Sequence, residues 1–263
     1  VDTFSKKRVA SVVVTFWDLV NSLTTAGITK GSTLLVHSSL SSFGYVEGGT
    51  ETVINALLQS VGEEGNVFVP TLTGKPTDGP DNPPVFDVRN TPCWTGKIPS
   101  DFMKLSQSKR SLHPTHSVSG IGPLVDDVIK GHEDSLTPCG KGSPYFKIAE
   151  QEGYILFLGV DLRSNTTIHT VEELAEVPYH LQKEKTECTI IDYDGNVIKR
   201  QLYLHDWGTP RYFQKIEEPL ESLEILTKTK CGNATIRLVK SMPMIEWLYK
   251  MLKKDPDYLI KEK

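Results

Sequence analysis

Residues 31–49 read GSTLLVHSSLSSFGYVEGG and carry the clearest sign of an α/β fold in the chain. Thr33 to Val36 is a short apolar run, typical of a buried strand. A polar, glycine-rich segment follows, and Thr50 to Val61 then carries apolar residues at helical spacing, with Thr50 as the expected N-cap. A strand that ends in small residues and leads into a helix is where α/β proteins bind ligands. On its own, however, the motif is explained better by a plain strand-to-helix turn.

Similar segments lie on both sides of this stretch. Val9 to Ala26 shows apolar residues at helical spacing before a glycine, which predicts a helix. Asn66 to Pro70 and Tyr154 to Val160 predict two more buried strands. Strands that alternate with helices in this way indicate an α/β sheet with crossover helices.

Two later regions depart from that pattern. Thr73 to Thr95 holds five prolines and shows neither a helical nor a strand period, which predicts a lid or a binding loop. Cys188 to Tyr193 and Val197 to Leu204 alternate around an Asp-Gly-Asn turn, which predicts a hairpin.

The end of the chain adds a predicted strand at Ala234 to Val239 and a closing amphipathic helix at Met242 to Leu252. We therefore predict an α/β fold: one elaborated domain over residues 1–263, with a central mixed sheet and an antiparallel C-terminal part.

Composition excludes several classes of protein. The 263 residues carry a net charge of -4, which argues against a nucleic-acid partner because phosphate binding needs a basic face. No apolar run reaches the roughly 18–20 residues of a membrane span, and the N-terminus shows no signal-peptide pattern. The four cysteines are scattered without a CxxC pair, which excludes a zinc ribbon and fits a reduced, cytoplasmic protein.

Residues 110–117, RSLHPTHS, form a second polar cluster. Pro114 predicts a turn here and not a helix. Arg110 is suited to binding a phosphate group. A solvated loop with incidental histidines explains the spacing equally well.

The third cluster, residues 165–176, reads NTTIHTVEELAE. Asn165 or Thr166 is placed to cap a helix, on which His169 and Glu172 would share one face. A carboxylate beside an imidazole fixes its tautomer and raises its basicity, as a general base requires. The acidic residues of this stretch also suit a polyamine, although a solvated helix face accounts for them equally well.

The sequence lacks GxGxxG, Walker, HExxH and GxSxG motifs, and also the pyrophosphate loop of the large acetyl-CoA-dependent N-acetyltransferase superfamily. Its clusters, in their order from Ala26 to Leu238, instead resemble the aminoglycoside N3-acetyltransferase family. The matching motifs are HSSLSSFG with Glu47-Gly48-Gly49, Val69-Pro70-Thr71, Thr91-Pro92, Gly96-Lys97-Ile98, Arg110-Ser111-Leu112-His113-Pro114 with Ser117, Gly142-Ser143-Pro144, Leu158-Gly159-Val160, Asn165-Thr166 with His169 and Glu172, and Gly232-Asn233-Ala234.

This resemblance implies an α/β/α fold, acetyl-CoA as the donor, and acetyl transfer to the 3-amino group of a 2-deoxystreptamine antibiotic, which confers resistance. It makes His169 and Glu172 the catalytic pair. Our own hypothesis for the mechanism is direct transfer to the amine, with an oxyanion stabilised by backbone N–H groups of the Ser38–Ser39 turn. No metal is expected, and a homodimer is left open. The residues implied to line the coenzyme A channel are His37, Ser38, Ser39, Leu40, Arg110, His113 and Ser117, and the carboxylates available to the antibiotic are Asp87, Glu173 and Glu176.

Further functions stay open at this point. Asp101 and Met103 stand where the family carries glutamate and arginine, and a His-Asp-Trp-Gly segment at residues 205–208 suggests a branch that acts on another amine. A non-catalytic coenzyme- or polyamine-binding protein is a second possibility, and a metal-dependent hydrolase is a third. The hydrolase would draw its ligands from His37, His113, His116 and His169, with Asp101 or Asp206.

Overall fold

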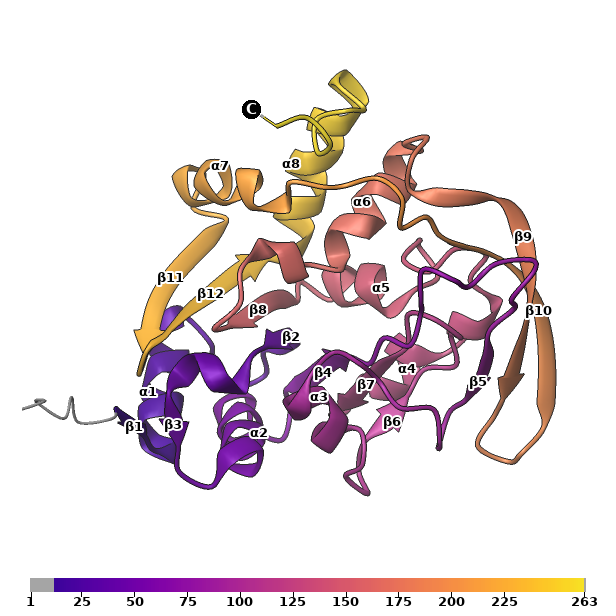
Figure 1. Ribbon diagram of the computed structural model, residues 1–263. Coiled ribbons are helices and arrows are strands. Elements are labelled where there is room, and N and C mark those ends of the chain that lie inside the picture. The colour runs from indigo at the N-terminus through magenta and orange to yellow at the C-terminus, as the bar shows by residue number, and fades with distance from the viewer. Residues whose placement is uncertain (1–11, 263) are drawn as a thin grey trace, which may run out of the picture.

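A computed structural model describes residues 12–262, and its centre is a seven-stranded mixed sheet (Figure 1). β2 is parallel to both of its neighbours, β8 and β4, and every other pairing in the sheet is antiparallel. In spatial order the strands are β11 (Leu226–Cys231), β12 (Ala234–Lys240), β8 (Tyr154–Leu158), β2 (Thr33–Ser38), β4 (Asn66–Pro70), β7 (Val118–Ile121) and β6 (Lys109–Arg110).

Helices cover both faces of this sheet, as the α/β/α prediction requires (Figure 1). Successive side chains of β2 point to opposite faces, so Leu34 and Val36 enter one core and Leu35 another. One face carries α1 (Phe16–Ala26), α2 (Gly49–Val61) and α3 (Lys97–Phe102). The other carries α4 (Val125–Ile129), α5 (Pro144–Glu150), α6 (Thr167–Ala175), α7 (Glu217–Ser222) and α8 (Ser241–Lys254).

A separate three-stranded sheet contains the predicted hairpin, β9 (Leu181–Ile191) and β10 (Val197–His205). β9 starts well before the predicted Cys188, and β5 (Val85–Asp87) pairs with it in parallel. The prediction that residues 73–95 contain no strand was therefore wrong. β5 is a three-residue strand beside prolines, and its partner lies about a hundred residues away, so local sequence carries no sign of the pairing.

Short elements complete the chain. β1 (Val13–Val14) pairs in parallel with β3 (Tyr45–Val46). Four 3-10 helices occupy connections in the described residues: η1 (Leu40–Phe43), η2 (His132–Asp134), η3 (Leu162–Ser164) and η4 (Phe213–Ile216).

Two helices begin elsewhere than predicted. α1 starts at Phe16 because Thr15 and Asp18 form a capping box; Val13 and Val14 are in β1, and residues 9–11 lie outside the described range. α2 is capped by Gly48 and not by Thr50. Gly48 has a φ of 76°, and a Cβ there would collide with the Thr52 hydroxyl.

Among residues 12–262, no helix has both the length and the apolar character needed to cross a membrane.

Candidate active site

The three parallel strands of the sheet end at one edge, where ligands bind in open α/β sheets. β2 continues through His37 to Ser38, and the Ser39 N–H donates to the Leu158 carbonyl of β8 at 2.9 Å. This bond fixes the loop that follows β2 beside the start of the connection from β8 to α6. It also occupies the Ser39 N–H, which therefore does not face a ligand as the predicted oxyanion donor.

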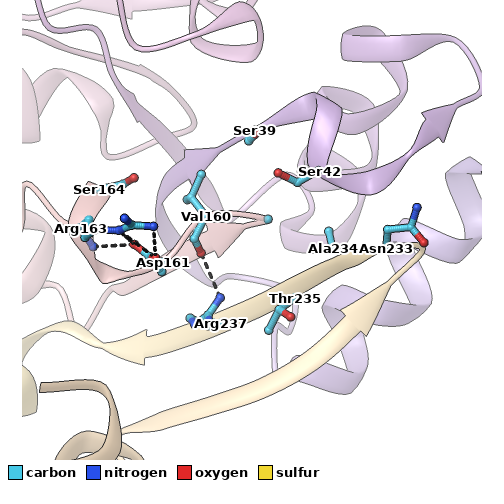
Figure 2. Close-up of a pocket in the computed structure, with 11 residues that line it drawn as sticks. Ser39, Ser42, Val160, Asp161, Arg163, Ser164, Asn233, Ala234, Thr235 and Arg237 are labelled. Atoms are coloured by element: carbon cyan, nitrogen blue, oxygen red, sulfur yellow. Dashed lines mark hydrogen bonds and ion pairs between the residues drawn. The ribbon is translucent and has the colours of Figure 1, made fainter. Parts of the chain in front are cut away.

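Two cavities flank this loop. One of about 630 Å³ is lined by Ser38, Ser39 and Leu40, with Gly96 and Lys97 opposite. The other, of about 580 Å³, lies between Ser39 and Ser42, residues 159–164 and the start of β12 (Figure 2). In Figure 2, Arg163 is paired with Asp161, and Arg237 donates to the Val160 carbonyl. The predicted residues Ser38, Ser39 and Leu40 are thus cavity walls.

The two residues at the end of β2 differ in their surroundings. His37 is buried and stacks on Phe157 with ring centroids 5.3 Å apart, and burial lowers its pKa to about 3, so the ring is neutral. The Ser38 hydroxyl is buried at the cavity wall and has no hydrogen-bond partner within the described residues. A ligand that reaches this wall would find an unused donor and acceptor in Ser38.

α6 carries the predicted catalytic pair. The Asn165 side chain caps the helix by accepting from the Thr167 N–H at 3.2 Å, whereas Thr166 makes no side-chain cap. One turn along, His169 Nδ1 lies 2.6 Å from Glu172 Oε2. The His169 side chain is 14% exposed and that of Glu172 is fully buried. The predicted contact between the two side chains is present.

Glu172 is shared by three cationic or protonatable groups. Arg211 Nε donates to its Oε1 at 3.1 Å, and His180 Nδ1 lies 3.1 Å from its Oε2. Burial raises the pKa of Glu172, but the hydrogen bond from His169 and the close contact with His180 outweigh that effect, and the net pKa is well below its ordinary value. Glu172 is therefore ionised, and the His169 Nδ1–H donates to it.

The electrostatics of His169 differ from the sequence-based expectation. Burial lowers the pKa of His169 more than Glu172 raises it, so the net pKa is below the ordinary value of 6.5. The ring is thus neutral at pH 7. With Nδ1–H bound to Glu172, the lone pair is on Nε2, as a general base requires.

Two histidines missed in the sequence surround His169. His180 precedes β9 and His205 ends β10, so the hairpin brings both to α6. The centroid of the His169 ring is 4.9 Å from that of His180 and 4.6 Å from that of His205. His180 Nε2 donates to Glu173 Oε1 at 3.1 Å. The sequence offered a signal only for His205, in its His-Asp-Trp-Gly segment.

Two tryptophans lie beside this group of histidines. The Trp207 ring packs edge-on against His205, with ring centroids 4.8 Å apart. Trp94, from the proline-rich loop, packs edge-on against Trp207 with ring centroids 6.2 Å apart. Both indoles are partly exposed, Trp94 by 53% and Trp207 by 37%. This part of the long loop therefore lies beside Trp207, which itself packs on His205, and its role as a lid or binding loop stays a prediction.

The 110–117 segment forms the predicted turn, but its side chains face inward. The Arg110 guanidinium is buried and donates to the Thr91 and Thr71 carbonyls and to the Ser117 hydroxyl. His113 is fully buried, and its Nδ1 accepts from the Thr115 and His116 N–H groups. In this structure Arg110, His113 and Ser117 hold the loop together. They are absent from the lining of both cavities beside Ser39, and their place in a coenzyme channel stays a prediction. The hydrogen bonds that a folded loop makes with distant segments are not visible in its motif.

The three predicted acceptor carboxylates are dispersed. Asp87 pairs with Ile191 at the far end of β9, about 36 Å along the strand from His180 at 3.3 Å per residue. Its carboxylate accepts from the Arg89 and Asn90 N–H groups, so Asp87 is a turn residue. Glu173 is buried and accepts from His180 and the Cys139 N–H. Only Glu176, at the end of α6, is exposed. The structure therefore does not bring the three carboxylates together, and their contact with an acceptor stays a prediction.

Comparison with known proteins identifies the family of this chain. The family model described as aminoglycoside 3-N-acetyltransferase matches residues 35–253. Aminoglycoside N(3)-acetyltransferase IV of Salmonella sp is 30% identical over 241 residues, which cover 91% of this chain and 87% of the relative. A mutant of aminoglycoside acetyltransferase AAC(3)-IVa in complex with a gentamicin has a TM-score of 0.81 and 28% identity, over 97% of this chain and 94% of that one. AAC-IIIb in a binary complex with CoASH shares the fold, with a TM-score of 0.79 and 24% identity over 92% of this chain and 97% of that one. The chain belongs to the aminoglycoside 3-N-acetyltransferase family.

Proposed function

We propose that this enzyme transfers the acetyl group of acetyl-CoA to the 3-amino group of a 2-deoxystreptamine aminoglycoside, with His169 as the general base. The activity and the donor are those of its family, and the gentamicin and CoASH complexes of its structural neighbours support both. The observation that carries the mechanism is the 2.6 Å contact of His169 with a buried, ionised Glu172 at the carboxyl edge of the sheet.

In this mechanism Glu172 orients the ring and His169 Nε2 removes a proton from the attacking amine. The amine forms a bond to the thioester carbonyl carbon, and the carbon–sulfur bond breaks to release the coenzyme A thiolate. Burial makes the neutral ring the resting state, so no proton has to be removed from His169 first.

We place the donor along the loop after β2. Ser38, Ser39 and Leu40 line the cavity, and the Ser38 hydroxyl is buried without a partner among the described residues. A rotation of the Ser38 side chain would let this hydroxyl donate to the thioester oxygen in place of the occupied Ser39 N–H. One correctly placed donor to a developing oxyanion contributes roughly 3 kcal/mol to transition-state stabilisation. His37 supports this wall by stacking on Phe157 and does not contact the donor directly.

We place the acceptor on the hairpin side of His169. Aminoglycosides are polycations, and the exposed faces of Trp94 and Trp207 together with Glu176 are suited to ammonium groups. Asp87 and Glu173 are too far away or too buried to take part. Because a donor such as acetyl-CoA is an intracellular metabolite, we also infer that the enzyme works in the cytoplasm.

The experiment that tests this function is coenzyme A release from acetyl-CoA in the presence of a panel of aminoglycosides and simple amines. We expect release with 2-deoxystreptamine compounds that carry a free 3-amino group. Release of coenzyme A with simple amines alone would show that this member of the family acts on another acceptor. No release with any amine would contradict the acetyltransferase assignment of this chain.

A further inference from the structure

His169, His180 and His205 form a group with the composition of a metal site. One ligand nitrogen from each lies within 4.8 Å of the other two. Three imidazoles are a common ligand set for Zn²⁺, which takes nitrogen ligands at about 2.0–2.1 Å. The hairpin supplies two of these ligands and α6 the third.

Each ring has a nitrogen to offer. His169 Nδ1 is held by Glu172, which leaves Nε2, and His180 Nε2 is held by Glu173, which leaves Nδ1. His180 Nδ1 lies 3.1 Å from Glu172 Oε2, and a bound ion would replace this contact. His180 Nδ1 is buried and makes no well-aligned hydrogen bond, and His205 Nδ1 is buried without any partner among the described residues. Two of the three rings thus carry the carboxylate partner that orients histidine ligands in zinc proteins.

The surrounding charges favour a cation. Glu172 and Glu173 outnumber Arg211, so the net charge around the three rings is negative when the rings are neutral. His169 is partly exposed and provides an entry path, whereas the other two rings are buried. No thiol belongs to the group.

From these observations we propose that His169, His180 and His205 bind one Zn²⁺ ion. Such an ion would occupy His169 Nε2. If the proposed function is correct, bound Zn²⁺ therefore acts as a reversible inhibitor of acetyl transfer, because it takes the lone pair that removes the proton from the amine.

The test is a titration of the chelator-treated protein with Zn²⁺ against a chromophoric zinc indicator, without acetyl-CoA or amine. We expect one tight site per chain and no comparable binding of Mg²⁺, which prefers oxygen ligands. H205Q and H180Q should each weaken the affinity at least tenfold, because even the loss of an outer carboxylate partner typically costs about 10–100-fold. Cys93→Ser is the matched control for adventitious thiolate binding and should leave the affinity unchanged.

The visible absorption spectrum of Co²⁺ bound to the wild-type protein tests the ligand set even if the histidine variants fail to fold. Imidazole ligation predicts visible d–d bands without a near-ultraviolet thiolate charge-transfer band. A thiolate band, the absence of stoichiometric binding, or unchanged affinity in both folded variants would overturn the proposal. Because these readouts use no substrate, they are independent of the acetyltransferase assay. Zinc binding without inhibition of an active enzyme would instead contradict the role of His169.

Discussion

Glu172 is the residue on which the electrostatics of the site depend. It is fully buried, yet His169, His180 and Arg211 surround its carboxylate at 2.6–3.1 Å. Breaking a buried ion pair from one side is strongly destabilising, by roughly 3–5 kcal/mol. Glu172 therefore has a structural role, in holding the hairpin to α6, as well as an orienting role toward His169.

Glu172→Gln separates these two roles. We expect a lower Tm, because Arg211 loses its ionic partner, and a kcat reduced less than in a variant without His169. The acidic limb of the pH–rate profile should move to lower pH. The carboxylate stabilises the imidazolium, so its removal lowers the pKa of His169 further. The measurement is kcat against pH on folded, chelator-treated protein. If the acidic limb of the pH–rate profile keeps its pH while Tm falls, Glu172 has a purely structural role.

The cysteines give a second prediction at this scale. Cys93 is partly exposed, whereas Cys139, Cys188 and Cys231 are buried. Burial raises the pKa of Cys139 well above its ordinary value and that of Cys188 to about 12, so neither forms a thiolate near neutral pH.

We therefore expect one thiol to react with Ellman's reagent in the native enzyme and four after unfolding. Cys93→Ser should remove the native reaction. Rapid labelling of a second thiol in the native enzyme would show that one of the three buried cysteines becomes exposed to solvent.

At the scale of elements, the site is assembled by a hairpin that the sequence predicts only in part. The turn at residues 194–196 and the alternation around it predict two strands. The start of β9 at Leu181 depends on its pairing with β10 and β5, which local sequence does not show. This start places His180 against α6. By contrast, α6 and its cap could be predicted because capping and the His169–Glu172 spacing are local.

Arg110 connects several elements at the other end of the sheet. From β6 it reaches the Thr71 carbonyl after β4, the Thr91 carbonyl of the long loop and the Ser117 hydroxyl before β7. Leaving a buried acceptor unpaired costs roughly 1–3 kcal/mol.

Arg110→Met should consequently lower the free energy of unfolding by about 3 kcal/mol. Its KM for acetyl-CoA should be close to that of the wild type. Lys109→Met, which removes an exposed pair with Asp126, is the matched control and should change stability by less than about 1 kcal/mol. Urea denaturation and donor kinetics measure the two effects. A raised KM for acetyl-CoA with unchanged stability would instead support the prediction that Arg110 lines the coenzyme channel.

Across the whole molecule, much of the order of strands and helices could be predicted from the sequence. Buried parallel strands appear there as short apolar runs, and helices as apolar residues at helical spacing. Asn66–Pro70 is an example in which prediction and structure coincide. The direction of side chains in irregular segments could not be predicted. His113 and Arg110 have the residue types of a ligand site, but folding turns them inward, where their hydrogen bonds are satisfied by groups of the protein itself. The position of Asp87 could not be predicted for a related reason, because it depends on the long-range β5–β9 pairing.

Donor binding is the prediction that concerns the molecule as a whole. Acetyl-CoA at a hundredfold excess over Kd should stabilise the folded state by about 2.7 kcal/mol, which corresponds to a rise in Tm of roughly 5–10 °C for a chain of this size. Ser39→Phe, which fills the wall shared by both cavities, should reduce that rise. Thermal denaturation with and without acetyl-CoA measures it. A Tm that does not change at millimolar acetyl-CoA would argue against the proposed donor site.

The most direct test of the central claim is the turnover number of His169→Ala with acetyl-CoA and a 2-deoxystreptamine aminoglycoside, in chelator-treated protein. A positioned general base typically contributes a factor of about 10²–10⁴, so we predict that kcat falls at least a hundredfold. The rise in Tm caused by acetyl-CoA should persist, because His169 does not line the donor cavity. A folded His169→Ala protein that keeps wild-type turnover would contradict the mechanism.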